Sequence, residues 1–237
     1  MKRIVISQPM FFPWIGIFEQ IRLADAYVHY DDALLPQGRS FVSRVQIKAP
    51  GGTQWLSLPI KRCGQPPINQ ALIDNDQQWR RKHLRTLAHC YAQAPYVDDM
   101  IGIVETVYDQ ASDHLCDLNI RSIQRVADYF GVTTDYHRAS DFHVGGHSTE
   151  KLLGLVQALH GTHYITGHGA RHYLDHDLFE RHGIRVEYMT YNRASYPQLH
   201  GAFDPHVTIL DLIANTGPEG RRYINSGSMY WKDFLHE

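Results

Sequence analysis

Three histidines spaced four residues apart, His168, His172 and His176, are the part of this sequence that most directly suggests chemistry. An imidazole with a pKa of about 6.5 can take a proton from an amine or an alcohol near neutral pH. His168 and His172 belong to a glycine-rich turn, and we take both as candidate general bases. The backbone amides of Gly167 and Gly169 are candidate donors to a substrate oxygen.

A metal site is an alternative interpretation of the same histidines. Residues four apart share one face of an α-helix, and Asp175 and Asp177 could add carboxylate ligands. The chain has no H-E-x-x-H motif and no cysteine pair nearby, and two glycines interrupt a helix through His168. We therefore assign no metal ligands, and expect these histidines to act as bases or as hydrogen-bonding groups.

A second group of candidates, His29, Asp31 and Asp32, lies at the end of an early β-branched and aromatic run. His29 and Asp31 could act as a base, and Asp32 could bind a sugar hydroxyl or an ammonium group. The alternative is an Asx turn that simply ends the strand.

Basic residues further along suggest an anchor for a phosphate or a carboxylate. Arg39, Arg44 and Lys48 precede or occupy one strand of an expected hairpin, and an arginine fork matches such anions bidentately. The alternative is an ordinary solvated strand face.

Two strand-to-loop junctions are expected to position these groups. The first, within residues 4–32, reads as a buried strand, an aromatic loop, a helix and a second strand. Gln8, Phe12 and Trp14 fall in its loop and are candidate substrate contacts. The second, within residues 163–174, is a strand followed by the glycine-rich turn and Tyr173, another candidate contact. Ligands of open α/β sheets bind beyond the carboxyl ends of the strands, so we expect the two loops to meet around one site.

The remaining patterns predict an α/β fold with a mostly parallel, Rossmann-like sheet, flanking helices and a helical insertion. A hairpin is expected at residues 44–60, and helices at about 77–94, 97–110, 112–129, 148–159 and 207–213. Further strands are expected at 71–73, 132–137 and 183–189. We treat residues 1–237 as a single domain with a helical segment at about 77–131.

Composition excludes several classes of function. A net charge of −2 does not favour binding to nucleic acid or to an anionic membrane. No apolar run is long enough to span a bilayer. P-loop, G-x-G-x-x-G and G-x-S-x-G motifs are missing. Three scattered cysteines and no signal peptide favour a cytoplasmic location with reduced thiols.

With these residues collected, the chain resembles the WbqC-like family of bacterial proteins. The resemblance runs nearly end to end, and its most specific segments are Gln8-Pro9, Phe12-Pro13-Trp14, Tyr30-Asp31-Asp32, Arg39-Ser40-Phe41, Trp79 with Lys82-His83, Ala94-Pro95-Tyr96, Tyr164 with Gly167, Tyr173-Leu174, Tyr196-Pro197 and Ile209-Leu210-Asp211 with Gly217-Pro218. The resemblance implies a role in the biosynthesis of O-antigen or other surface polysaccharides, such as lipopolysaccharide.

The reaction we expect is acyl or aminoacyl transfer to a nucleotide-linked amino sugar. It needs a base near the amine, donors for a developing oxyanion and an anchor for phosphates. The co-substrate would be an activated acyl donor linked to coenzyme A or to an acyl-carrier protein, which would then also be a partner; a homo-oligomer is left open. Two alternatives are a non-catalytic module that binds a sugar or a carrier, and a metal-dependent hydrolase or isomerase built on the histidines.

Overall fold

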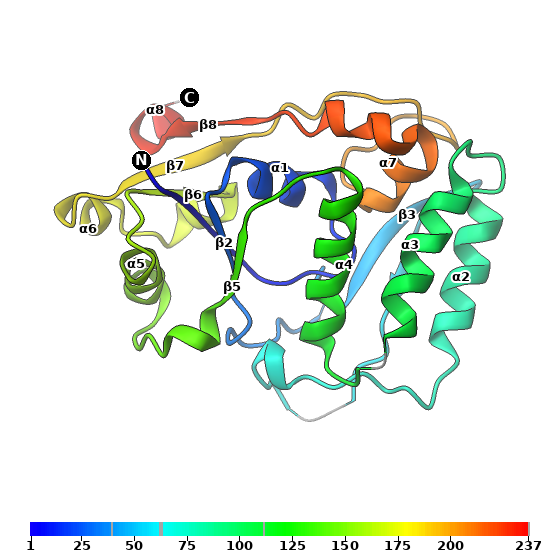
Figure 1. Cartoon of the computed structure of the whole chain (residues 1–237), viewed down its shortest axis with the longest axis horizontal. Coiled ribbons are helices and arrows are strands. Elements are labelled where there is room, and N and C mark those ends of the chain that lie inside the picture. Colours follow the sequence, from blue (N-terminus) through cyan, green and yellow to red (C-terminus); the bar gives the residue numbers. More distant parts are fainter. Residues whose placement is uncertain (39, 62–63, 111, 237) are drawn as a thin grey trace.

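A six-stranded, mostly parallel sheet forms the centre of the protein in a computed structural model, which describes residues 1–38, 40–61, 64–110 and 112–236 (Figure 1). Its strands are β1 (Arg3–Ser7), β2 (Ala26–His29), β5 (Asp135–Arg138), β6 (His163–Thr166), β7 (Arg185–Thr190) and β8 (Gly227–Tyr230). Their order is β5-β2-β1-β6-β7-β8, with only β8 antiparallel to its neighbour. A separate antiparallel hairpin joins β3 (Arg44–Ala49) to β4 (Gly52–Ser57).

Some of the helices cover the two faces of the sheet, and the others pack against neighbouring helices (Figure 1). They are α1 (Ile15–Leu23), α2 (Trp79–Cys90), α3 (Val97–Asp109), α4 (Leu115–Tyr129), α5 (Ser148–Ala158), α6 (His176–Arg181), α7 (Ile209–Thr216) and α8 (Trp231–His236). The predicted α/β class with a mostly parallel sheet and a hairpin is therefore confirmed. None of the helices in the described ranges combines the length and apolar character that crossing a bilayer requires.

Successive side chains of β1 enter two different hydrophobic clusters, because neighbouring residues of a strand point to opposite faces. Ile4 packs in a cluster with residues of α5 and α6, whereas Val5 packs with residues of α1, α4 and α7. Both side chains are fully buried, as expected for the central strand of a parallel sheet. This double burial fixes the position of β1 from both sides.

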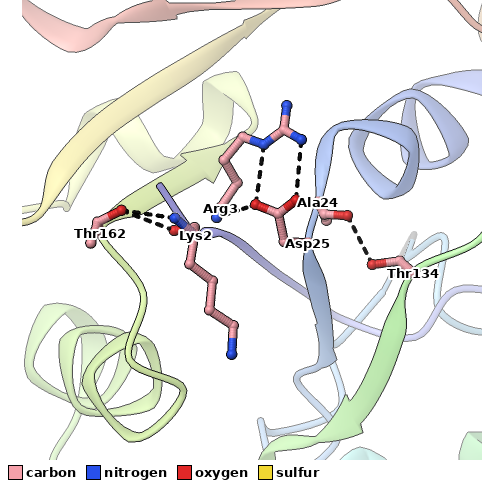
Figure 2. Close-up of polar contacts among 6 residues, drawn as sticks. All are labelled: Lys2, Arg3, Ala24, Asp25, Thr134 and Thr162. Atoms are coloured by element: carbon pink, nitrogen blue, oxygen red, sulfur yellow. Dashed lines mark hydrogen bonds and ion pairs between the residues drawn. The ribbon is translucent and has the colours of Figure 1, made fainter.

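The amino ends of the strands are tied together by polar contacts (Figure 2). The backbone N–H of Lys2 donates to the hydroxyl of Thr162, which precedes β6, at 2.9 Å. Arg3 donates to the Asp25 carboxylate from its backbone N–H at 2.7 Å and also from its guanidinium. Thr134 donates to the carbonyl of Ala24 at 2.9 Å. Four neighbouring strands are thus linked at this edge, opposite the edge at which their carboxyl ends lie.

Several local predictions need correction. The expected strand at 71–73 forms only isolated bridges, from Leu72 to His114 and from Ile73 to Ile60. The strand expected at 132–137 begins later, as β5, because the chain first leaves α4 after Tyr129 and turns through Gly131, which has a φ of 61°. The strand β8 and the helix α8 had no counterpart in the sequence patterns, since both are short edge elements.

A buried carboxylate links α7 to the hairpin side of the molecule. Asp211 is 0% exposed and accepts hydrogen bonds from the hydroxyl of Tyr91 at 2.8 Å and of Tyr196 at 3.0 Å. Burial raises the pKa of Asp211, and the hydrogen bonds from these donors offset only part of this rise. Because a buried charge needs its donors, the two tyrosines are expected to matter for stability.

Replacing Tyr91→Phe should therefore lower the free energy of unfolding by about 1–3 kcal/mol, because one buried oxygen of Asp211 loses its donor. Urea denaturation followed by circular dichroism measures this change. Tyr129→Phe is the matched control, because the Tyr129 hydroxyl bonds to Asp99 near the surface. Equal losses in the two variants would contradict this explanation.

Candidate functional site

A cleft of about 580 Å³ opens at the carboxyl ends of β1 and β6. These strands are neighbours, but β1 is followed along the chain by β2 on its other side. The loops after β1 and β6 therefore leave the sheet on different sides, which is the arrangement that forms ligand sites in open α/β folds. The lining includes Ser7, Gln8, Trp14, Gln20, Tyr30, Tyr164, Thr166, Gly167, His168, Gly169, Tyr173, Tyr191, Arg193 and His206.

The loop after β1 supplies one aromatic wall of the cleft. The Trp14 ring lies 4.8 Å from the Tyr191 ring and 5.6 Å from the His206 ring, measured between centroids. A Cβ on Gly16 would come within 2.3 Å of the Trp14 ring, so a glycine is required beneath it. Phe12 takes a different place: it is 0% exposed, lies in the core with Phe11, and is not part of the cleft lining.

The glycine-rich turn after β6 forms the floor. Residues His168–His172 adopt a 3₁₀ helix, and Gly167, His168 and Gly169 line the cleft. The Nε2 atom of His168 lies 2.7 Å from the carbonyl oxygen of Met189. Because a carbonyl can only accept, Nε2 carries the proton and Nδ1 of the neutral ring keeps a lone pair. This tautomer is the one that a general base needs at Nδ1.

The carboxyl-terminal segment packs behind this histidine. The Phe234 ring of α8 lies 4.9 Å from the His168 ring and 4.5 Å from the Tyr188 ring of β7. Trp231 stacks on His176 at 4.4 Å, and its indole N–H donates to Glu180. His168 is thus held between the sheet and the end of the chain.

His29 lies outside the cleft lining and inside the core. It is 1% exposed, stacks on Tyr136 at 5.6 Å, and neither ring nitrogen has a hydrogen-bond partner among the described residues. Burial, reinforced by the nearby Arg138 guanidinium, lowers the pKa of His29 to about 3. A ring in this position is neutral and remote from a bound ligand.

The two aspartates make contacts within the fold. Asp31 is 0% exposed and accepts from the backbone N–H of Ser140 at 3.0 Å and from its hydroxyl at 2.7 Å. Asp32 forms an ion pair with Lys151 at 2.5 Å. Both lie at the carboxyl end of β2, as expected, but neither belongs to the cleft lining.

Of the remaining predicted site residues, some line the cleft and others do not. Tyr173 lines the cleft and is 55% exposed, whereas the His172 ring lies outside the lining and accepts from the Arg171 side chain at 3.1 Å. The Arg44 guanidinium lies over the Trp55 ring at 4.2 Å, and the buried Lys48 amine donates to the carbonyl of Ala202. Neither lines the cleft.

Arg39 lies outside the described residues. Within the described ranges, Arg193 and the two histidines at 168 and 206 are the basic side chains that line the cleft. An anion in this space would therefore meet the loop after β7, and the hairpin that carries Arg44 and Lys48 is not part of its wall.

Sequence reasoning missed several lining residues. Gln20 lies on α1, and Tyr191, Arg193 and His206 lie in the loop between β7 and α7. Tyr191 directly follows β7, a strand that the sequence did predict. The expectation that ligands bind beyond the carboxyl ends of strands, applied above to β1 and β6, would have identified Tyr191 if it had also been applied to β7. Arg193 and His206 lie in irregular chain, where no periodicity signals a role.

The metal interpretation finds no support in the geometry. Among the described residues, no three histidine, cysteine or acidic side chains are grouped so that they could hold a metal ion. The histidines spaced by four have separate partners: His168 bonds to Met189, His172 to Arg171, and His176 to the Tyr188 hydroxyl at 2.7 Å.

Comparison with known proteins assigns the family. The model of the WbqC-like protein family matches residues 8–223, which include the loops after β1 and β6 that form the cleft. The chain belongs to the WbqC-like protein family. A relative from Mycobacterium tuberculosis (strain ATCC 25618 / H37Rv), the uncharacterized protein Rv1507c, is 32% identical over 228 residues, covering 94% of this chain and 98% of its own length. No solved structure matches significantly.

The buried His29 of this WbqC-like protein predicts a pH effect on stability. In the unfolded chain a histidine takes up its proton near pH 6.5, whereas folded His29 stays neutral until about pH 3. Its contribution to stability is therefore complete above pH 6.5 and declines as the pH falls, by up to about 1.4 kcal/mol per pH unit.

Replacing His29→Leu should remove this dependence. The free energies of unfolding of the wild type and the variant, measured by urea denaturation at several pH values, should diverge between pH 6.5 and 4 in favour of the variant. Parallel curves over that range would show that His29 does not stay neutral in the folded protein.

Proposed function

We propose that this protein is a transferase that binds a nucleotide-linked amino sugar in the cleft and transfers an acyl or aminoacyl group to its amine. The observation that carries this proposal is the lining itself. It combines stacking rings, neutral hydrogen-bonding groups and a histidine with a free Nδ1 lone pair, and it contains no carboxylate among the described residues. A cleft of this composition suits uncharged rings and an anion better than a cation.

The two ends of such a substrate match two regions of the cleft. Trp14, Tyr30 and Tyr173 offer flat faces for a base or a sugar ring, while Arg193 and His206 offer positive charge for the phosphates. Arg193 has a φ of 49°, a strained backbone conformation that is common at functional sites. We accordingly assign the phosphate anchor to Arg193 and His206, in place of the hairpin arginine and lysine.

His168 is the group that we assign as general base. As the sugar amine attacks the carbonyl carbon of an acyl thioester, a C–N bond forms, and Nδ1 of His168 takes the amine proton. The tetrahedral intermediate then collapses, the C–S bond breaks, and the thiolate leaves with the proton that His168 returns. The donor in this scheme is an acyl thioester of coenzyme A or of a carrier protein.

The biological setting follows from the family resemblance and the chemistry. We place the reaction in the biosynthesis of O-antigen-type surface polysaccharides, in the cytoplasm, where nucleotide-linked sugars and acyl thioesters are available.

One observation favours a second candidate, a non-catalytic module that binds the same class of sugar. Of the four residues expected to act as a base, His168 alone lines the cleft, and a binding module needs none of them. The two functions differ in whether the wild type turns over any substrate. If it does, the loss of His168 should lower turnover while binding is retained.

The test is incubation with a panel of nucleotide-linked amino sugars and acyl thioesters, read by mass spectrometry. We expect one pair to give an acylated sugar, and His168→Ala to lower its rate by about 10²- to 10⁴-fold while the Kd for the nucleotide sugar stays similar. His172→Ala is the matched comparison, because that ring lies outside the lining. Binding of a nucleotide sugar without turnover of any pair would favour the binding module.

A further inference from the structure

Tyr191 occupies a central place in the cleft. It directly follows β7, its ring lies 4.8 Å from that of Trp14 and 5.1 Å from that of His168, and it lines the cavity. Burial is the main cause that raises the pKa of Tyr191 to about 12, so the phenol is protonated at neutral pH. It is therefore a hydrogen-bond donor beside the assigned base.

The hydrogen of this phenol has no acceptor among the residues that the structure describes. The Gln20 amide nitrogen of α1 donates to the Tyr191 oxygen at 2.6 Å, so this contact occupies the oxygen as an acceptor. No hydrogen bond from the Tyr191 O–H to another described residue accompanies it. Because a phenol both accepts and donates, its O–H remains available for a group in the cleft.

A glycine keeps the phenol close to the turn after β6. A Cβ at Gly167 would lie 3.2 Å from the Tyr191 oxygen and 3.4 Å from the Gln20 nitrogen, so a larger residue would crowd this pair. The pair thus lies against the residue that precedes His168. Donor and base come from the ends of β7 and β6, which are neighbouring strands of the sheet.

We propose that Tyr191 is a second catalytic residue, whose O–H donates to the carbonyl oxygen of the acyl group, and that Gln20 is a positioning residue that fixes this phenol. The inference rests on the proposed function and deepens it. When the amine attacks, the carbonyl oxygen gains negative charge and the Tyr191 hydrogen bond strengthens. The oxygen returns to a carbonyl when the thiolate leaves, and Tyr191 keeps its proton throughout.

The acyl oxygen remains in the product, which allows a test by binding alone. Two probes share the nucleotide and the sugar ring and differ at one nitrogen: UDP-N-acetylglucosamine carries a neutral amide with the acyl carbonyl, and UDP-glucosamine carries a free amine. Each variant is compared with the wild type on the same probe, so that the difference in charge between the probes cancels. Isothermal titration calorimetry with the full chain gives a Kd for each. Tyr191→Phe should weaken binding of the acetylated probe by about 3- to 10-fold, the effect of one neutral hydrogen bond, and leave the other Kd unchanged.

Two further variants separate a catalytic role from a structural one. Gln20→Met keeps the phenol but removes the hydrogen bond that holds it. This variant should weaken binding of the acetylated probe only, and by a smaller factor than Tyr191→Phe does. Tyr136→Phe is the matched control, since its hydroxyl is also buried but lies away from the cleft without a partner among the described residues. It should change neither Kd. If Tyr191→Phe does not fold, as judged by thermal unfolding, Gln20→Met carries the test.

The outcomes distinguish this inference from the proposed function. If Tyr191→Phe weakens the binding of both probes equally, or of neither, Tyr191 only contributes to the wall of the cleft. The inference is then overturned, while the proposed function stands. Binding of neither these probes nor any other nucleotide-linked amino sugar of the panel, with or without its acyl group, to the wild type would overturn both. In an acylation assay, Tyr191→Phe should lower kcat by about 10²- to 10³-fold and leave the KM for the amino sugar unchanged.

Discussion

The parallel pairing of β1 on both of its edges is the constraint on which the rest of the structure depends. β2 and β6 run alongside β1 in the same direction, so three consecutive carboxyl ends lie at one edge of the sheet. The chain must leave β1 toward one side and β6 toward the other, which leaves a gap between the two loops. The hydrophobic clusters on either face hold β1 in this position, and the polar ties at the amino ends keep the opposite edge closed.

Within this gap, the walls come from segments that lie far apart in the sequence. Trp14 and Gln20 belong to the first βα unit, His168 to the second junction, and Tyr191 to the loop after β7. Each is positioned by a neighbour from another segment: Tyr191 by Gln20, and His168 by the carbonyl of Met189. The site therefore depends on the register of three strands, more than on any single motif.

The sequence predicted the framework well because the framework follows periodic patterns. β1, β2, β6, the hairpin and the long helices all carry hydrophobic spacings that a single sequence reveals. The side-chain roles were harder to predict. Spacing by four suggested that His168, His172 and His176 share a helix face, but the first two lie in a 3₁₀ helix and the third begins α6. Since a 3₁₀ helix has about three residues per turn, the common face considered in the metal alternative does not form, and the glycines at 167 and 169 had already argued against it.

His29 illustrates a second reason why the roles of side chains were harder to predict than the framework. A strand that is buried on both faces has no polar side, so its alternation does not reveal whether a histidine points to the core or to a site. Arg193 and His206 illustrate a third, because their positions depend on an irregular loop whose course is decided by tertiary contacts such as the ring of Trp14 against His206.

The packing of α8 behind His168 has an evolutionary consequence. The family match ends at residue 223, whereas Trp231 and Phe234, which press on His176 and His168, lie beyond it. The surroundings of this imidazole are thus supplied partly by a tail that the shared family pattern does not specify. Relatives that keep the same cleft but end in a different tail are free to change the packing and orientation of the residue at this position without rebuilding the sheet.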